Sequence, residues 1–328
     1  GDGPDIIDAA SFSGEIITAG AMTDLLKYIE SDVELSIDDF LSGPLSAMMT
    51  EDGKLLAIAP IFYVSTFVCR TGTVEIKRYD GVIHSLSRMG TPEAAFAGTC
   101  SADTFLRLAF CCGDVDDYSR EEIAAILKYA ARLPAGEDYS AEAENLTSGN
   151  QLLMPDTLGS GMHLMSTVLN FFGTTSIEDL TVFGLPFREG TGVVVPAMYL
   201  AIPSNSDNAD GAWAFLKSLL MEGSPAENEY PLLKDRYEAT KAADENSIEK
   251  GLKTYYMVNG QEIEYVFENA DFYELSDALL NGVNGVYDAD AIAFGIVKDA
   301  CAAFFAGNKT AEDSADEILS RLNIYFSE

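Results

Sequence analysis

Hydrophobic and polar positions change along this chain in blocks that predict strands followed by helices. Residues 193–202 form a near-continuous apolar run, which is typical of a strand buried on both faces of a parallel sheet. A polar turn at residues 203–208 follows, and Trp213, Leu216 and Leu220 then recur three and four positions apart, as one buried helix face requires. Repeated along the chain, this pattern predicts an α/β fold.

Residue types that cap helices or break strands set the expected boundaries. Ser36 with Asp39 and Ser119 with Glu122 have capping-box spacing, Thr310 begins the last helix, and Pro196 places its strand at an edge or at a crossing between domains. The expected strands are residues 5–10, 54–60, 61–68, 151–155, 177–183 and 193–202. The expected helices are residues 22–29, 36–41, 100–109, 119–130, 162–172, 209–220, 235–250, 271–280, 292–305 and 310–325.

Length and charge narrow the architecture and the partners. A chain of 328 residues exceeds the usual size of one hydrophobic core, so two lobes are expected. Apolar residues make up 48% of the chain, which indicates a folded protein. The net charge of −33, from 53 acidic and 20 basic residues, excludes nucleic acid and anionic lipid surfaces as partners. The acidity itself is typical of a soluble, self-repelling surface.

The sequence offers little material for a metal centre or a nucleophilic catalytic pair. Its five cysteines lack the spacing of metal ligands and are expected to be reduced and buried. The two histidines, His84 and His163, lie far apart in the sequence. We therefore expect no metal and no cofactor.

The chain lacks an apolar run long enough to cross a membrane, and it does not open with a secretory leader. Its first residues, Gly1, Asp2, Gly3 and Pro4, form a turn directly before a predicted strand. A secreted protein would have lost its leader, and this abrupt start is what such a loss would leave.

Several segments resemble the extracellular solute-binding proteins of ABC importers, in the family 1 group that often carries sugars. The resemblance covers nearly the whole chain apart from residues 70–91, where the expected pattern is absent. The segments that carry it are residues 3–7, 53–68, 156–161, 184–186, 190–192, 200–202, 208–216 and 304–312.

This resemblance implies a two-lobe periplasmic-binding-protein fold of type II, each lobe a mixed or parallel sheet flanked by helices. The implied first lobe is residues 1–66 plus 191–230, and the second is residues 67–190 plus 231–328. In the family, further elements precede the segment matching residues 3–7, so the first lobe is expected to be truncated. Hinge motion is expected at the two crossings, near residues 60–66 and 190–196.

The same resemblance implies a non-enzymatic function. The protein would be an extracellular, cell-surface lipoprotein, with its leader absent from this chain, that acts as a monomer. It would capture a small molecule, a sugar or oligosaccharide, and deliver it to a membrane permease.

Ligand-binding residues are expected where loops at the carboxyl ends of parallel strands converge on the interlobe crevice. Four separated segments would then meet. They contribute Phe12 and Ser13 from the first lobe, Tyr63 and Ser65 from the outbound crossing, Asp156, Thr157 and Ser160 from the second lobe, and Glu189 and Tyr199 from the return crossing.

Two alternatives remain open from the residues alone. A glycan hydrolase could use two carboxylates, such as Asp156 and Glu189, as acid and base. Gly159 and Gly161 could also belong to a phosphate-binding loop, but the Gly-Lys-Ser/Thr continuation is absent, and a turn into the helix at residues 162–172 explains them better.

Overall fold

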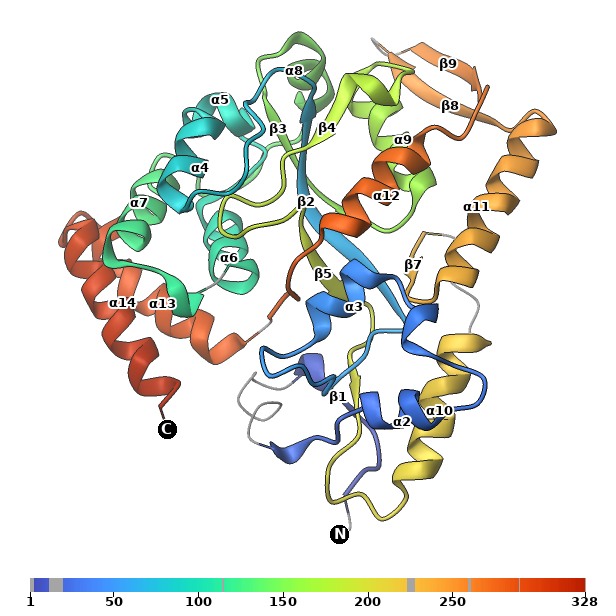
Figure 1. Cartoon of the computed structure of the whole chain (residues 1–328). Helices are drawn as coiled ribbons and strands as arrows, with labels where there is room; N and C mark the ends of the chain where they lie inside the picture. The colour runs from blue at the N-terminus through green and yellow to red at the C-terminus, as the bar shows by residue number, and fades with distance from the viewer. Residues whose placement is uncertain are drawn as a thin grey trace.

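The computed structural model describes residues 3–11, 20–113, 115–222, 228–258, 261–288 and 290–327. Its central element is β2 (Ile61–Arg70), which runs through the middle of the molecule (Figure 1). Around β2 the structure places four antiparallel partners in one five-stranded sheet. These partners are β3 (Leu153–Leu158), β4 (Leu180–Val182), β5 (Val193–Pro196) and β7 (Tyr230–Pro231).

Side chains of the central sheet alternate between two hydrophobic cores. Phe62, Val64 and Val68 of β2 belong to the larger core, whereas Phe67 and Cys69 belong to the other. This follows from the two-residue period of a strand, which directs neighbouring side chains to opposite faces. The buried run of β2 is therefore apolar on both faces.

Helices cover both faces of this sheet (Figure 1). The larger core contains side chains from α2 (Leu26–Ser31), α3 (Ser42–Met48), α8 (Glu142–Ser148), α9 (Gly161–Thr167), α10 (Ala209–Met221), α11 (Lys234–Glu249) and α12 (Phe272–Gly282). The other contains side chains from α4 (Val82–Met89), α5 (Pro92–Phe96), α6 (Ala102–Cys112), α7 (Arg120–Ala130), α13 (Ala291–Phe305) and α14 (Ala311–Tyr325). Short 3-10 turns are η1 (Ala9–Ser11), η3 (Ile37–Asp39), η4 (Val115–Asp117) and η6 (Ile177–Asp179).

A second, two-stranded sheet joins the start of the chain to the segment after β5. β1 (Ile7–Asp8) pairs antiparallel with β6 (Leu200–Ala201), with Ile7 opposite Ala201. A small core around this pair contains Ala9, Met22 and Leu56. Both segments belong to the first lobe as the sequence analysis implies it, and this pairing places them in one sheet.

Local capping chemistry sets several helix starts as predicted. The backbone N–H of Glu122 donates to Ser119 Oγ at 3.2 Å, and the Ser119 N–H donates to Glu122 Oε2 at 3.0 Å. This reciprocal pair opens α7. The box at Ser36 and Asp39 forms as well, but the turn that it opens is the 3-10 turn η3.

The expected strand at residues 54–60 is wrong. Among the described residues its ladder is limited to a bridge between Ile58 and Leu200. The Leu55 N–H donates instead to the Asp24 side chain at 3.1 Å, and the Leu55 carbonyl accepts from the Leu25 N–H at 2.8 Å. The residues just before α2 therefore satisfy part of the backbone of this segment.

The expected continuous strand at residues 193–202 is also corrected. It divides into β5 and β6, because β5 ends at Pro196, which has no N–H to donate, and Ala197 and Met198 are exposed. β5 pairs antiparallel with β2, and Val194 also forms a parallel bridge with Val286. Two crossings that run in opposite directions side by side form an antiparallel ladder.

Two further differences concern strand extent. The loop expected at residues 156–161 begins later, because β3 continues through Leu158. A hairpin of β8 (Lys253–Val258) and β9 (Gln261–Val266) lies where the sequence pattern predicted no element.

Candidate ligand-binding site

Three separated segments meet where β3 ends beside β2. A Cβ atom on Gly159 would lie 1.8 Å from the carbonyl oxygen of Asn228 and 2.8 Å from Cδ1 of Tyr63. Neither distance is compatible with van der Waals contact, so only a glycine lets these backbones approach. Gly159 thus brings Tyr63 of β2 and the segment before β7 to the start of α9.

His163 is the polar centre of this junction. Its backbone N–H donates to Ser160 Oγ at 3.0 Å, which caps α9. Its Nδ1 atom accepts from the Gly159 N–H at 3.4 Å, so the neutral imidazole carries its proton on Nε2. That Nε2 atom lies 3.7 Å from Asp156 Oδ1.

Asp156 supports this arrangement from β3. Its Oδ2 atom accepts a hydrogen bond from Thr167 Oγ1 at 2.9 Å, which ties the strand to the end of α9. Its side chain is 12% exposed, whereas that of His163 is 35% exposed. Asp156 therefore acts on the junction through its two partners on α9.

A cavity of about 410 Å³ opens beside His163. It is lined by Tyr63, Met162, His163, Ser166, Leu169, Asn170, Asn228, Thr254 and Phe267. These residues supply a hydroxyl-bearing ring, amides and hydroxyls among apolar surfaces, and none of them is Lys, Arg, Asp or Glu. A few convergent polar groups within an apolar lining are typical of a small-molecule site.

The tyrosine at the edge of the cavity is held in place. Tyr63 Oη donates to Glu229 Oε1 at 2.7 Å, and this hydrogen bond, together with partial burial, raises the pKa of Tyr63 above its ordinary value. A fixed aromatic ring that is partly exposed can stack against a ligand.

The helix wall of the cavity contains an irregular turn. α9 continues as the π-helical turn η5 (Val168–Phe172), from which Leu169 and Asn170 line the cavity. Such wide turns occur frequently at functional sites because they redirect side chains that a regular helix would place elsewhere.

Ser65, Thr157, Glu189 and Tyr199, four further predicted site residues, are not among the residues that line this cavity. Ser65 is 7% exposed within β2 and pairs with Thr157 and Val193. Adjacent residues of a strand direct their side chains to opposite sides of the sheet. The side chains of Asp156 and Thr157 in β3 therefore lie on different sides. Phe12 and Ser13 lie outside the described residues.

The two residues predicted at the return crossing lie in different surroundings. Glu189 Oε1 lies 3.4 Å from Arg78 Nε and lines a second cavity. Tyr199 is half-buried beside β1, where its N–H donates to Asp8 Oδ1 at 3.3 Å, and burial raises the pKa of its phenol. The structure thus joins Tyr63 with Asp156 and Ser160 through His163, and one site for all nine residues stays a prediction.

The sequence interpretation did not predict the helix face that lines the first cavity. Five of the lining residues come from α9 and η5. Met162, Ser166, Leu169 and Asn170 recur at helical spacing with His163, so the 3.6-residue period could have identified this face. Asn228, Thr254 and Phe267 are brought in by tertiary structure, which has no local signal.

The remaining expectations concern the cysteines, a metal site and a membrane-spanning helix. All five cysteines are buried and free, as predicted. Within the described ranges, no three or more His, Cys, Asp and Glu side chains gather as a metal site would require. None of the described helices has both the length and the apolar character of a membrane span.

No protein-family model matches the sequence, and no curated protein does so either. Solved structures do match. The sugar-binding protein MalE from the phytopathogen Xanthomonas citri is 12% identical, with a TM-score of 0.53 over 99% of this chain and 86% of that one. The extracellular solute-binding protein family 1 structure from Alicyclobacillus acidocaldarius is 12% identical, with a TM-score of 0.50 over 100% and 85%.

A third structure agrees with these two. The maltose/maltodextrin-binding domain MalE from Bdellovibrio bacteriovorus, bound to maltotriose, is 10% identical, with a TM-score of 0.50 over 100% of this chain and 86% of that one. Structural similarity along nearly the whole chain at such low sequence identity shows a shared fold. The chain has the two-lobe α/β fold of the MalE-like periplasmic-binding proteins, as predicted.

Proposed function

We propose that this chain is an extracellular solute-binding protein that captures a carbohydrate and delivers it to the permease of an ABC importer. The observation that carries the proposal is a full-length match in fold to proteins whose names state sugar or maltodextrin binding. The chemistry of the 410 Å³ cavity is an independent support.

The cavity suits a neutral, polyhydroxylated ligand. The ring of Tyr63 offers an apolar face for the C–H side of a sugar, and Asn170, Asn228 and His163 offer amide and imidazole groups for its hydroxyls. An acidic ligand would meet no cationic side chain among the described lining residues. It would also be repelled by a chain of net charge −33.

In this proposal the lobes are residues 1–66 plus 191–230, and residues 67–190 plus 231–328. The outbound crossing in β2 and the return crossing in β5 pair directly, Val64 opposite Val194. Paired crossings give the lobes a common axis, and closure over the ligand would be a hinge motion at their ends. The larger core contains residues of both assigned lobes, such as Leu25 and Leu164.

The proposal is of a binding protein without catalytic activity. The two carboxylates considered for a hydrolase lie in different settings: Asp156 is bonded to Thr167 beside the first cavity, whereas Glu189 faces Arg78 in the second. Acid and base catalysis of glycan cleavage needs both groups on one scissile bond. This separation does not favour the hydrolase alternative.

The partners and location follow from the same proposal. The protein would act as a monomer outside the cell, held at the cell surface by a lipid anchor, and would dock on a membrane permease when closed. The large negative charge keeps such a protein soluble and self-repelling.

Thermal unfolding with a panel of neutral mono- and oligosaccharides, acidic sugars and short peptides tests the function. A neutral saccharide should stabilise the protein by mass action, about 2.7 kcal/mol at one hundred times the dissociation constant. The stabilisation should persist on prolonged incubation, with the saccharide recovered intact by chromatography. A shift that decays as products form would reverse the assignment to a binding protein, and a response to peptides alone would exclude a carbohydrate.

A further inference from the structure

A second cavity, of about 280 Å³, lies between residues 76–79, α4 and the loop that leads into β5. Its lining includes four basic residues, Lys77, Arg78, Arg88 and Arg188, and one acidic residue, Glu189. The whole chain has 20 basic residues against 53 acidic ones. One-fifth of its cationic side chains thus line one small cavity.

Two of the four arginine and lysine side chains are anchored in the protein. Arg88 Nη1 donates to Asp80 Oδ1 at 2.6 Å and Nη2 donates to Ser85 Oγ at 2.9 Å, and its side chain is 12% exposed. Arg188 Nη1 donates to the carbonyl oxygen of Cys112 at 3.1 Å. These contacts anchor the side chains of two arginines that line the cavity.

The other two cationic side chains are exposed and weakly held. Arg78 is 88% exposed and lies 3.4 Å from Glu189, while Lys77 is 55% exposed and lies 2.8 Å from Glu75. Ion pairs this exposed contribute little and exchange partners readily. Arg78 and Lys77 can therefore turn to a ligand without a large loss of internal contacts.

We propose that this cavity binds a small oxyanion, a phosphate or carboxylate group. Arginine guanidinium groups match such anions through paired N–H donors, and a lysine ammonium adds charge from the rim. The volume, at the lower end of ligand pockets, suits an anionic group or a small molecule that carries one. The lining residues described for this cavity differ from those of the carbohydrate cavity, so the inference does not rest on the proposed function.

The proposal predicts opposite effects on anion affinity for substitutions of Glu189 and of the basic residues. As the acidic residue in the lining, it occupies Arg78 and repels an incoming anion. Its neutralisation should strengthen anion binding, whereas neutralisation of Arg78 or Lys77 should weaken it. If these residues only supported the fold, their substitutions would not change anion affinity in opposite directions.

The test is a calorimetric titration of the full chain with inorganic phosphate. It is carried out at about 10 mM ionic strength, where salt screens charge interactions only weakly. Acetate and glucose 6-phosphate are titrated in parallel to separate carboxylate, free phosphate and sugar-borne phosphate. We expect saturable binding at one site by at least one of the three. Arg78→Gln and Lys77→Gln should each weaken it about two- to fivefold, the range of exposed charge pairs, and Glu189→Gln should tighten it by a similar factor.

Lys128→Gln is the matched control, because Lys128 is 58% exposed, is paired with Glu312 and does not line the cavity. Its affinity for the anion should equal that of the unchanged protein. Equal weakening by Lys128→Gln and Lys77→Gln would overturn the proposal, because only overall charge would then matter. Absence of saturable binding by all three anions would overturn it as well.

Discussion

Thr66 of β2 donates its hydroxyl hydrogen to the carbonyl oxygen of Thr191, and the two oxygen atoms lie 2.5 Å apart. Thr66 is 1% exposed, so this bond lies in the interior between the outbound and return crossings. Next to it a Cβ atom on Gly192 would lie 2.5 Å from the Ser65 carbonyl oxygen. The two crossings are thus fixed to each other in the interior at the start of the return crossing.

Thr66→Val tests this fixed point. Valine keeps the shape of threonine but leaves the buried Thr191 carbonyl without this donor, so we expect a loss of about 1 to 3 kcal/mol in the free energy of unfolding. Urea denaturation measures it. Thr175→Val, at an exposed position, is the control and should change little. Equal effects of both variants would contradict a special role for the Thr66 bond.

Gly159→Ala tests the meeting of β2, α9 and the segment before β7. The new methyl group would need the space of the Asn228 carbonyl oxygen, 1.8 Å away, so the backbone must move. We expect a destabilisation of about 1 to 3 kcal/mol and weaker carbohydrate binding. Gly136→Ala serves as the control, because a Cβ there has no neighbour within 4 Å. An unchanged stability and affinity in Gly159→Ala would exclude the described close approach.

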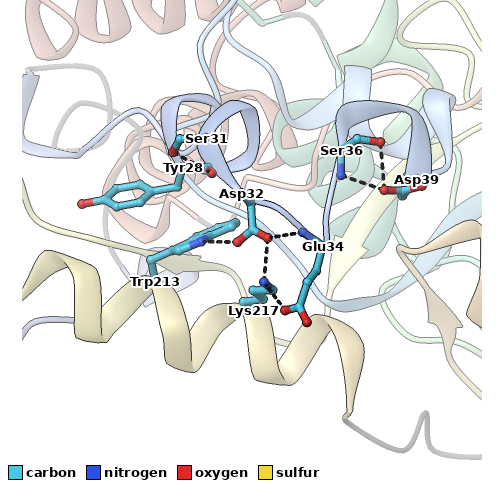
Figure 2. A network of polar contacts seen from close by, with 8 residues as sticks. All are labelled: Tyr28, Ser31, Asp32, Glu34, Ser36, Asp39, Trp213 and Lys217. Carbon is cyan, nitrogen blue, oxygen red and sulfur yellow. Dashed lines mark hydrogen bonds and ion pairs between the residues drawn. The ribbon is translucent and has the colours of Figure 1, made fainter.

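Figure 2 shows a polar network that ties the end of α2 to α10. Asp32 accepts from Lys217 Nζ at 2.6 Å, from the Glu34 N–H at 2.9 Å and from Trp213 Nε1 at 3.2 Å. These bonds, with that of Lys217 first, lower the pKa of Asp32 from 3.8 to about 2. Trp213 therefore has a structural role, packed in the core and fixed by this carboxylate.

The network predicts a pH dependence with a definite sign. Because the folded state lowers the pKa of Asp32, its contribution is present above pH 3.8 and is lost as the pH falls toward about 2. Asp32→Asn should cost on the order of 1 kcal/mol at pH 7. The difference between the two proteins in chemical denaturation should shrink between pH 4 and pH 2. A difference that stays constant over this range would show that ionisation of Asp32 is not involved.

Features governed by neighbours in the sequence were predictable. The Ser119 and Glu122 capping box needs only residues within one turn, and it opens α7 as expected. The strand at residues 61–68 was identifiable because its β-branched and aromatic run is buried on both faces, as β2 is. The hairpin of β8 and β9 was missed because residues 253–258 lack a strict alternation, although Asn259 and Gly260 in the sequence are the residue pair that most favours a hairpin turn.

The candidate site was less accessible, because tertiary contacts assemble it. Tyr63 was identified from its place at the crossing, but Asn228 and Thr254 lie in segments without a motif and reach the cavity only in the fold. Asp156 was assigned to a loop, yet it belongs to β3 and acts on His163 and Thr167. Sequence pattern indicates which strand ends are available, not which helix face closes the space beside them.

Asp156 is predicted to act on the ligand through His163. Asp156→Ala removes the acceptor for Thr167 and the carboxylate near Nε2, so His163 should lose its fixed orientation. We expect carbohydrate affinity to fall by about 1 to 3 kcal/mol. Calorimetric titration measures it, and Asp156→Asn, which keeps an oxygen acceptor, should retain part of the affinity. If both variants bind as well as the unchanged protein, Asp156 has no part in the site.

Two substitutions of Tyr63 distinguish ring stacking from hydrogen bonding in the proposed carbohydrate site. Tyr63→Ala removes the ring from the cavity wall and should weaken saccharide binding by about 1 to 3 kcal/mol. Tyr63→Phe keeps the ring and loses only the bond to Glu229, so its affinity should remain closer to that of the unchanged protein. Tyr139→Ala is the matched control, because Tyr139 is 60% exposed and does not line the cavity. Equal losses in Tyr63→Phe and Tyr63→Ala would assign the effect to the hydroxyl, and no loss in either would place the ligand elsewhere between the lobes.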